Sequence, residues 1–178
     1  IGSGLVIINI GDYIFFSNIE IGILSTVFTV FCVICLTNAF HFIDGVDGLC
    51  SGSFLISIIS LVGFSYFSNT SHLIIEKELI YIIIISIILF MFFNFFNYFK
   101  IFLGDSGSTT LGFLISWFLI LNTQIYETIH PVLALWCVAI PSFDIMSVIL
   151  RRLLRKKNPF KPDRRHIHHI LLNIGCQV

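Results

Sequence analysis

Two aspartates, Asp44 and Asp47, stand three residues apart in NAFHFIDGVDGLC, residues 38–50, and a glycine follows each of them. At this spacing two carboxylates would share one face of a helix, whereas the glycines favour a looser helix end or turn that leaves room for a ligand near the backbone. Asn38 adds an amide one to two turns earlier. The alternative is a pair of carboxylates that are simply hydrated at a membrane edge. We treat Asp44, Asp47 and Asn38 as candidate site residues.

A third carboxylate, Asp105, lies in the Gly- and Ser-rich run FLGDSGSTTLG, residues 102–112. The run opens an expected apolar helix, and the exposed N–H groups of a helix N-terminus suit an anionic group. A carboxylate only accepts hydrogen bonds, so Asp105 suits a hard cation such as Mg²⁺, which in turn would hold phosphate oxygens. An ordinary N-cap is the alternative, but a cap explains one polar residue and not the whole GDSGS run.

The next candidate segment is basic: eight of the ten Lys and Arg residues fall within 151–165, and the segment leads into RRHIHH, residues 164–169. A charge run beside an apolar span is commonly a topology signal or a site for anionic lipids, but neither explains the restrained NPFKPD loop. Zinc is an alternative for the histidines, although zinc takes three or four strong ligands and no cysteine is close. Contact with pyrophosphate is the better interpretation for His166, His168 and His169.

Asp144, in IPSFDIMSVILRR, is the one formal charge inside an expected span. Ionisable residues at membrane depth are expensive and usually functional. Asp144 either orients the basic segment or lines the cavity, with Arg151 and Arg152 on the same helical face, or it is an internal hydrogen-bond or salt-bridge partner. The CVIC sequence of Cys32 and Cys35 resembles a redox or metal motif, but cysteine in mid-span behaves as a small hydrophobe.

Long apolar stretches separate these motifs. Of the 178 residues, 57% are hydrophobic and 11% charged, whereas soluble domains are about a quarter charged. No charged residue occurs in 21–43, 48–75, 79–99 or 106–126, and only Asp144 interrupts 128–150. About 20 apolar residues span a bilayer as a helix.

We therefore predict an all-α fold, a polytopic transmembrane helical bundle that forms a single membrane domain over residues 1–178. It should have about five complete spans, near 21–40, 49–67, 79–97, 109–122 and 130–150, plus the start of a sixth. The segment 5–22 is broken at Gly11-Asp12, which suits a short external β-hairpin.

The positive-inside rule places the basic segment 151–165 in the cytoplasm. Alternating spans then place Asp44, Asp47 and Asp105 at the same face of the membrane. Polar loops without a shared role would fall on both faces. The distribution therefore favours one cytoplasmic site built from three loops.

The motifs NAFHFIDGVDGL, FLGDSGSTTLG, IPSFDIMSVILRR and NPFKPDRRHIHH occur in this order. Over about residues 20–178 the chain resembles the polyprenyl-phosphate N-acetylhexosamine-1-phosphate transferases, a superfamily that includes the phospho-MurNAc-pentapeptide translocase. It is most similar to the bacterial branch that uses undecaprenyl phosphate and UDP-GlcNAc and starts O-antigen, common-antigen or teichoic-acid linkage synthesis.

The resemblance implies an enzyme, a Mg²⁺-dependent phosphotransferase with Mn²⁺ as an alternative metal. The lipid phosphate would attack the β-phosphate of a UDP-sugar at the cytoplasmic face of the bacterial inner membrane and release UMP. By similarity, Asp105 would bind the metal, and Asp44 and Asp47 would line the nucleotide-sugar pocket. The phosphates or sugar would contact Arg152 and the three histidines, His166, His168 and His169. No nucleic-acid partner is expected, and a homodimer is left open.

The sequence departs from the family pattern in two places. The family carries an Asp-Asp pair in an early cytoplasmic loop, and no Asp-Asp occurs here. We therefore expect a fragment of a longer transferase that lacks the N-terminal spans and is inactive alone. The family also usually has Asn at the position of His41, so either His41 substitutes as a metal ligand or the metal shell differs; His matches Mg²⁺ less well than an amide oxygen does.

Two alternatives come from other functional classes. A transporter or channel could use the intramembrane acidic residues as a cation path, but it predicts acidic groups at several depths and access from both faces. A truncated, inactive relic of the transferase is the second alternative. An Asp-Asp motif upstream would favour the enzyme over the relic.

Overall fold

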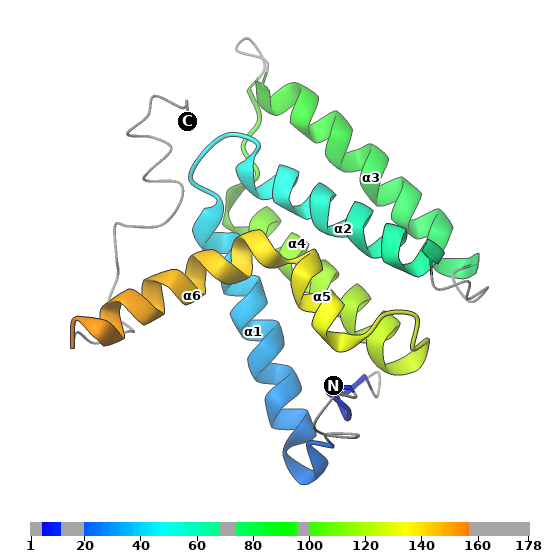
Figure 1. Cartoon of the computed structure of the whole chain (residues 1–178). Helices are drawn as coiled ribbons and strands as arrows, with labels where there is room; N and C mark the ends of the chain where they lie inside the picture. The colour runs from blue at the N-terminus through cyan, green and yellow to red at the C-terminus, as the bar shows by residue number, and fades with distance from the viewer. Residues whose placement is uncertain (1–4, 12–19, 68–73, 96–99, 157–178) are drawn as a thin grey trace.

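The computed structural model describes residues 5–11, 20–67, 74–95 and 100–156, and helices dominate these ranges. A 3₁₀ turn, Gly22–Leu24, precedes the first α-helix, and a π-helical turn, Leu121–Ile125, follows the fourth. Figure 1 shows the helices as one bundle. Their bounds are α1 Ser25–Ile43, α2 Leu49–Phe67, α3 Ile74–Phe95, α4 Gly104–Ile120, α5 Pro131–Cys137 and α6 Ala139–Leu154.

Four of the described helices are long and apolar enough to cross a membrane: α1 with its 3₁₀ turn, α2, α3, and α4 with its π-helical turn. The pair α5 and α6 would add a fifth span if the two helices are counted together. Large apolar side chains are exposed along α1 and α3, as expected for helices that are hydrophobic all round and face lipid. The predicted all-α polytopic bundle is confirmed, and the chain is a multi-pass membrane protein.

The predicted fifth span, 130–150, consists of two helices and not of one continuous helix. The chain breaks at Val138, and α5 and α6 meet at an angle of 87°. Pro141 gives the physical reason: it has no N–H to donate to the carbonyl of Cys137, and its ring would clash with that carbonyl in a continuous helix. Proline is tolerated in a first helical turn, which is where α6 places it.

Two helices begin earlier than predicted, α3 at Ile74 and α4 at Gly104. Polar residues extend α4 because their hydroxyls find partners within the helix. Thr109 and Thr110 donate to the carbonyls of Asp105 and Ser106, at 2.7 and 2.6 Å. The apolar limits of a span therefore underestimate the helix, and Asp105 lies in its first turn.

The core forms mainly where α1 packs along α4, with α2 completing it. Gly112 makes the close approach possible, since a Cβ built on it would lie 2.8 Å from the Thr37 Cα and 3.2 Å from the Phe40 Cβ. Helix α3 packs on α2, and its buried residues Ile80, Ile87 and Asn94 recur every seven positions. This contact brings the last turn of α3 to the end of the bundle where α1 and α2 are joined (Figure 1).

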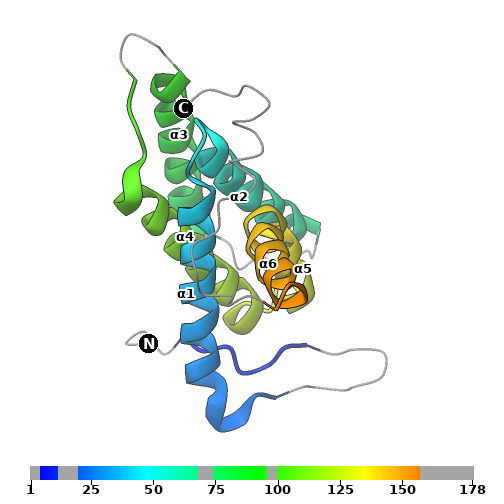
Figure 2. The same ribbon diagram turned by 90° about the vertical axis from the view of Figure 1, so that its left-hand side faces the viewer.

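The predicted β-hairpin is reduced, among the described residues, to one antiparallel bridge between Asn9 and Glu20. The Ile21 N–H donates to the Ile8 carbonyl at 3.0 Å. The Gln124 side chain completes the pairing: its Oε1 accepts from the Ile8 and Asn9 N–H groups, and its Nε2 donates to the Asn9 carbonyl. This segment lies at the opposite end of α1 from the connection to α2 (Figure 2).

Candidate active site

The connection between α1 and α2 is a tight turn that carries Asp44 and Asp47. Helix α1 ends at Ile43, Asp44 is its C-cap, and the Leu49 N–H donates to the Val46 carbonyl at 3.1 Å. Gly48 has φ +71°, and a Cβ there would collide with the Phe95 ring of α3. The two aspartates therefore lie in the looser arrangement that the glycines favoured, and not on one helical face.

The turn forms one wall of a cavity of about 210 Å³, and the segment before α4 forms another. Asp44, Asp47 and Asp105 all line this cavity, although 58 or more residues separate Asp105 from the other two. The structure thus brings the three predicted carboxylates together. The remaining lining residues are Gly45, Val46, Gly48, Ser51, Phe90, Asn94, Phe102, Leu103 and Gly104.

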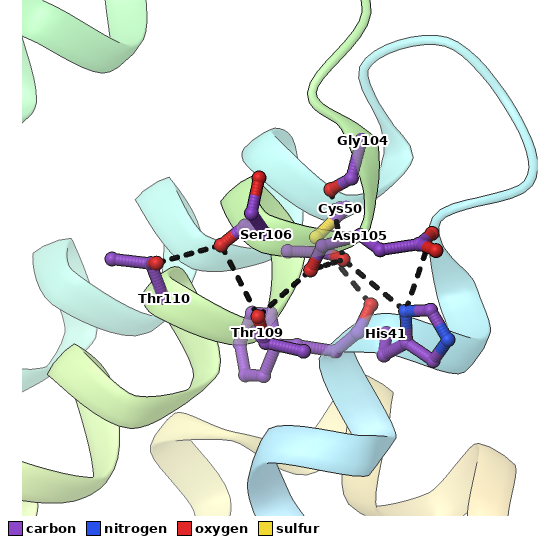
Figure 3. A network of polar contacts seen from close by, with 9 residues as sticks. His41, Cys50, Gly104, Asp105, Ser106, Thr109 and Thr110 are labelled. Atoms are coloured by element: carbon purple, nitrogen blue, oxygen red, sulfur yellow. Dashed lines mark hydrogen bonds and ion pairs between the residues drawn. The ribbon is translucent and has the colours of Figure 1, made fainter.

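The Asp105 carboxylate is open to a ligand. Its side chain is 94% exposed and contacts His41, whose Nδ1 lies 3.8 Å from Oδ1 (Figure 3). The N-cap of α4 is Leu103, without a side-chain cap. The Ser108 hydroxyl donates back to the Gly104 and Asp105 carbonyls at 3.2 Å. The N-cap alternative therefore does not account for Asp105.

His41 connects α1 to the start of α4. Its Nδ1 faces both the Asp105 carboxylate and the Ser108 hydroxyl, which lies at 3.4 Å. Which partner donates to which depends on the imidazole tautomer. Nδ1 cannot donate to Asp105 or Ser108 and bind a metal at the same time, so through this nitrogen His41 either orients the Asp105 carboxylate or ligates a metal.

The Asp44 carboxyl has a raised pKa. Burial in the turn is the main cause, because it disfavours the charged form. The nearby Asp105 and Asp47 carboxylates raise the pKa further, while His41 lowers it. Three carboxylates near one cavity therefore create an excess of negative charge that a bound cation would relieve.

Two further residues support the walls of the cavity, and neither was predicted from the sequence. Lys100 Nζ lies 2.6 Å from Asp47 Oδ2. Asn94 is 4% exposed; its Nδ2 donates to the Ile101 carbonyl at 2.7 Å, and its Oδ1 has no hydrogen-bond partner among the described residues. A signal for Lys100 was available, since it is the only Lys or Arg between Lys77 and Arg151. Asn94 lies within an apolar run and offered none.

Several predicted site residues lie elsewhere. The Asn38 amide donates to the Ile34 carbonyl within α1 at 2.9 Å, and Asn38 does not line the cavity. Arg152 is in the last turn of α6, which lies apart from the α1–α2 turn (Figures 1 and 2). Asp144 is buried. The histidines His166, His168 and His169 are outside the described residues, as is most of the basic segment.

The residues of the cavity fit Mg²⁺ if only one or two of its ligands come from the protein. Over residues 5–11, 20–67, 74–95 and 100–156, no group of three or more His, Cys, Asp or Glu side chains is arranged to enclose a metal. Mg²⁺ is commonly held by one or two carboxylates, with waters and substrate phosphates filling its other positions. Asp105 and Asp44 are the carboxylates suited to this mode, because Asp47 is already paired with Lys100.

The chain is similar to known transferases. A family profile, glycosyl transferase family 4, matches residues 1–123. The undecaprenyl-phosphate alpha-N-acetylglucosaminyl 1-phosphate transferase of Escherichia coli K12 is 36% identical over 139 residues, which is 78% of this chain and 38% of that protein. The proteins of the same name from Yersinia pestis and Pasteurella multocida are 35% identical over 139 residues and 47% identical over 76. The Pasteurella match covers 42% of this chain and 21% of the relative, and the Yersinia match covers the same shares as that of Escherichia coli. The chain therefore belongs to glycosyl transferase family 4.

Proposed function

We propose that the full-length protein transfers a sugar 1-phosphate, N-acetylglucosamine 1-phosphate, from a UDP-sugar to undecaprenyl phosphate. The observation that carries this proposal is the convergence of Asp44, Asp47 and Asp105 on one cavity. These residues belong to the motifs that resemble the polyprenyl-phosphate transferases, and the Escherichia coli relative carries the corresponding name. The chain spans 38% of that relative, so the activity belongs to the whole protein.

In the proposed reaction an oxygen of the lipid phosphate attacks the β-phosphorus of the UDP-sugar. A new P–O bond forms to the lipid, and the bond between the β-phosphorus and the bridging oxygen breaks. UMP leaves with the electron pair of that bond, and the product is a lipid-linked pyrophosphate sugar. Phosphoryl transfer of this kind depends mainly on positioning and on stabilisation of negative charge.

The residues of the cavity have distinct roles in this proposal. Asp105 and Asp44 hold Mg²⁺, or Mn²⁺ in its place, and the metal supplies positive charge to the phosphate oxygens. His41 orients the Asp105 carboxylate from α1. The turn that carries Gly45 and Gly48 lines the cavity and would lie against the nucleotide. The histidines at 166, 168 and 169, with Arg152, remain candidates for contact with the phosphates or the sugar.

The proposal includes the membrane and the face at which the site lies. The positive-inside rule puts the basic segment in the cytoplasm, and the same alternation puts the cavity at the cytoplasmic face of the bacterial inner membrane. A cation path would require acidic groups at several depths along the bundle. The gathering of three carboxylates at a single cavity favours a transferase site over such a path.

An assay of UMP release tests the proposal. Membranes that contain the full-length protein should release UMP from UDP-GlcNAc only when undecaprenyl phosphate and Mg²⁺ are present, and a panel of UDP-sugars identifies the preferred donor. Asp105→Asn removes the charge but keeps the shape of the side chain, and we expect it to lower the rate at least about a hundredfold. Unchanged release from that variant would refute the metal role of Asp105.

A further inference from the structure

Three consecutive residues before α4 are each held by a side-chain contact. Lys100 forms its ion pair with Asp47 at 2.6 Å, and its Nζ lies 5.2 Å from the centroid of the Phe102 ring. The Ile101 carbonyl between them accepts from the buried amide of Asn94. Residues 100–103 are not helical, so these contacts, and not a helical ladder, fix the path of the segment.

The ion pair is well shielded from water. The Lys100 side chain is 23% exposed and the Asp47 side chain 13%. Exposed ion pairs contribute little, but removing one partner of a buried pair leaves an uncompensated charge and is strongly disruptive. The pair also joins two elements that are distant in the sequence, the α1–α2 turn and the segment that leads into α4.

We propose that Lys100 is the positioning residue of this site, and that it acts through Asp47. By holding residues 100–104 against the α1–α2 turn, the pair fixes the distance between Asp44, on one wall of the cavity, and Asp105, on the other. This inference rests on the proposed function and assigns different roles to the three aspartates. Asp47 is engaged with Lys100, and Asp44 and Asp105 are the carboxylates left for the metal.

The pair also limits the negative charge of the cavity. Without Lys100, no Lys or Arg of the described ranges would contact the three carboxylates that line the cavity, and Asp47 would present an unpaired charge to a diphosphate. Neutralising Asp47 from within the protein lowers this repulsion before any cation binds. Loss of Lys100 should therefore weaken binding of the nucleotide sugar more than it lowers the rate of reaction of the bound complex.

The test compares four variants of the full-length protein in membranes: Lys100→Met, Lys100→Arg, Asp47→Asn and the double variant that combines Lys100→Met with Asp47→Asn. Methionine keeps the apolar stem and removes the charge. We expect Lys100→Met to raise the KM for the UDP-sugar about tenfold with a smaller fall in kcat. Lys100→Arg should stay within about threefold of the wild type, because arginine restores the ion pair.

The double variant separates positioning from direct contact. If Lys100 acts through Asp47, the double variant should lie within about threefold of Asp47→Asn alone, because residues in contact are not additive. If the effects of the two single substitutions on KM multiply in the double variant, the proposal is overturned and direct contact of Lys100 with phosphate is favoured. Lys77→Met, at the other end of α3, is the matched control for loss of a lysine and should leave the KM unchanged.

A second readout keeps the proposal testable if the proposed function fails. The melting temperatures of the same variants, purified in detergent, give the coupling between Lys100 and Asp47 without any activity. Non-additive losses of melting temperature would support the pair even if the wild type released no UMP. Additive losses would refute the structural link itself.

Discussion

Gly112 is the position at which a single methyl group should disturb both the fold and the site. An alanine Cβ there would lie 2.8 Å from the Thr37 Cα and 3.2 Å from the Phe40 Cβ. The nearer atom belongs to the backbone of α1, so relief requires a shift of the whole helix. Overpacking of this kind costs about 1–3 kcal/mol. The shift would also move His41, the residue after Phe40, away from Asp105 on α4.

The assay is the melting temperature of the full-length protein in detergent, measured beside its UMP release. A loss of about 1–3 kcal/mol should lower the melting temperature by a few degrees or more. Gly63→Ala is the matched control: Gly63 lies within α2, and a Cβ there would meet nothing within 4 Å. That change should be neutral or stabilise the helix by up to about 1 kcal/mol. Equal effects of the two substitutions would refute the close packing of α1 on α4.

The remaining predictions concern the site and the end of the bundle that carries residues 8 and 9. Because folding raises the pKa of Asp44, the contribution of Asp44 to the free energy of unfolding is present below the pKa of the unfolded state and is lost as the pH rises through the pKa of the folded state. Asp44→Asn should abolish this dependence when the free energy of unfolding is measured against pH. Because the pKa of Asp44 is raised, protons compete with Mg²⁺ for its carboxylate, and the Mg²⁺ concentration that gives half-maximal UMP release should rise as the pH falls. In Asp44→Asn this concentration should be higher than in the wild type and should no longer rise as the pH falls. Chelation with EDTA should stop UMP release and added Mg²⁺ should restore it; release that persists after chelation would count against a metal. Gln124→Ala removes three hydrogen bonds to residues 8 and 9. Limited proteolysis beside residues 8 and 9 should become faster, whereas an unchanged cleavage rate would show that the Gln124 side chain does not hold this segment.

Much of the fold could be predicted from the sequence because the membrane imposes simple rules on composition. A charge-free apolar stretch of about 20 residues is typical of a membrane-spanning helix, and α2 has the predicted bounds, 49–67. The break between α5 and α6 was missed, although Pro141 was the signal for it. The early start of α4 was also missed, because its hydroxyls bond within the helix.

The site was only partly predictable, for a different reason. Asp44, Asp47 and Asp105, which line one cavity, could be predicted as candidates because carboxylates beside glycines are unusual in an apolar chain. The pair between Lys100 and Asp47 depends on how the segment before α4 packs on the α1–α2 turn, and a single sequence does not contain that contact. The same holds for Asn94, whose position at the end of a buried stripe on α3 becomes evident only when α3 is packed on α2.

The identity of the transferred group tests the central claim most directly. The measurement uses UDP-GlcNAc labelled in both the sugar and the β-phosphate, undecaprenyl phosphate, Mg²⁺ and membranes with the full-length protein. Transfer of a sugar 1-phosphate predicts that both labels enter the lipid in a one-to-one ratio and that UMP appears in the aqueous phase. Entry of the sugar label alone, with release of UDP, would contradict the account.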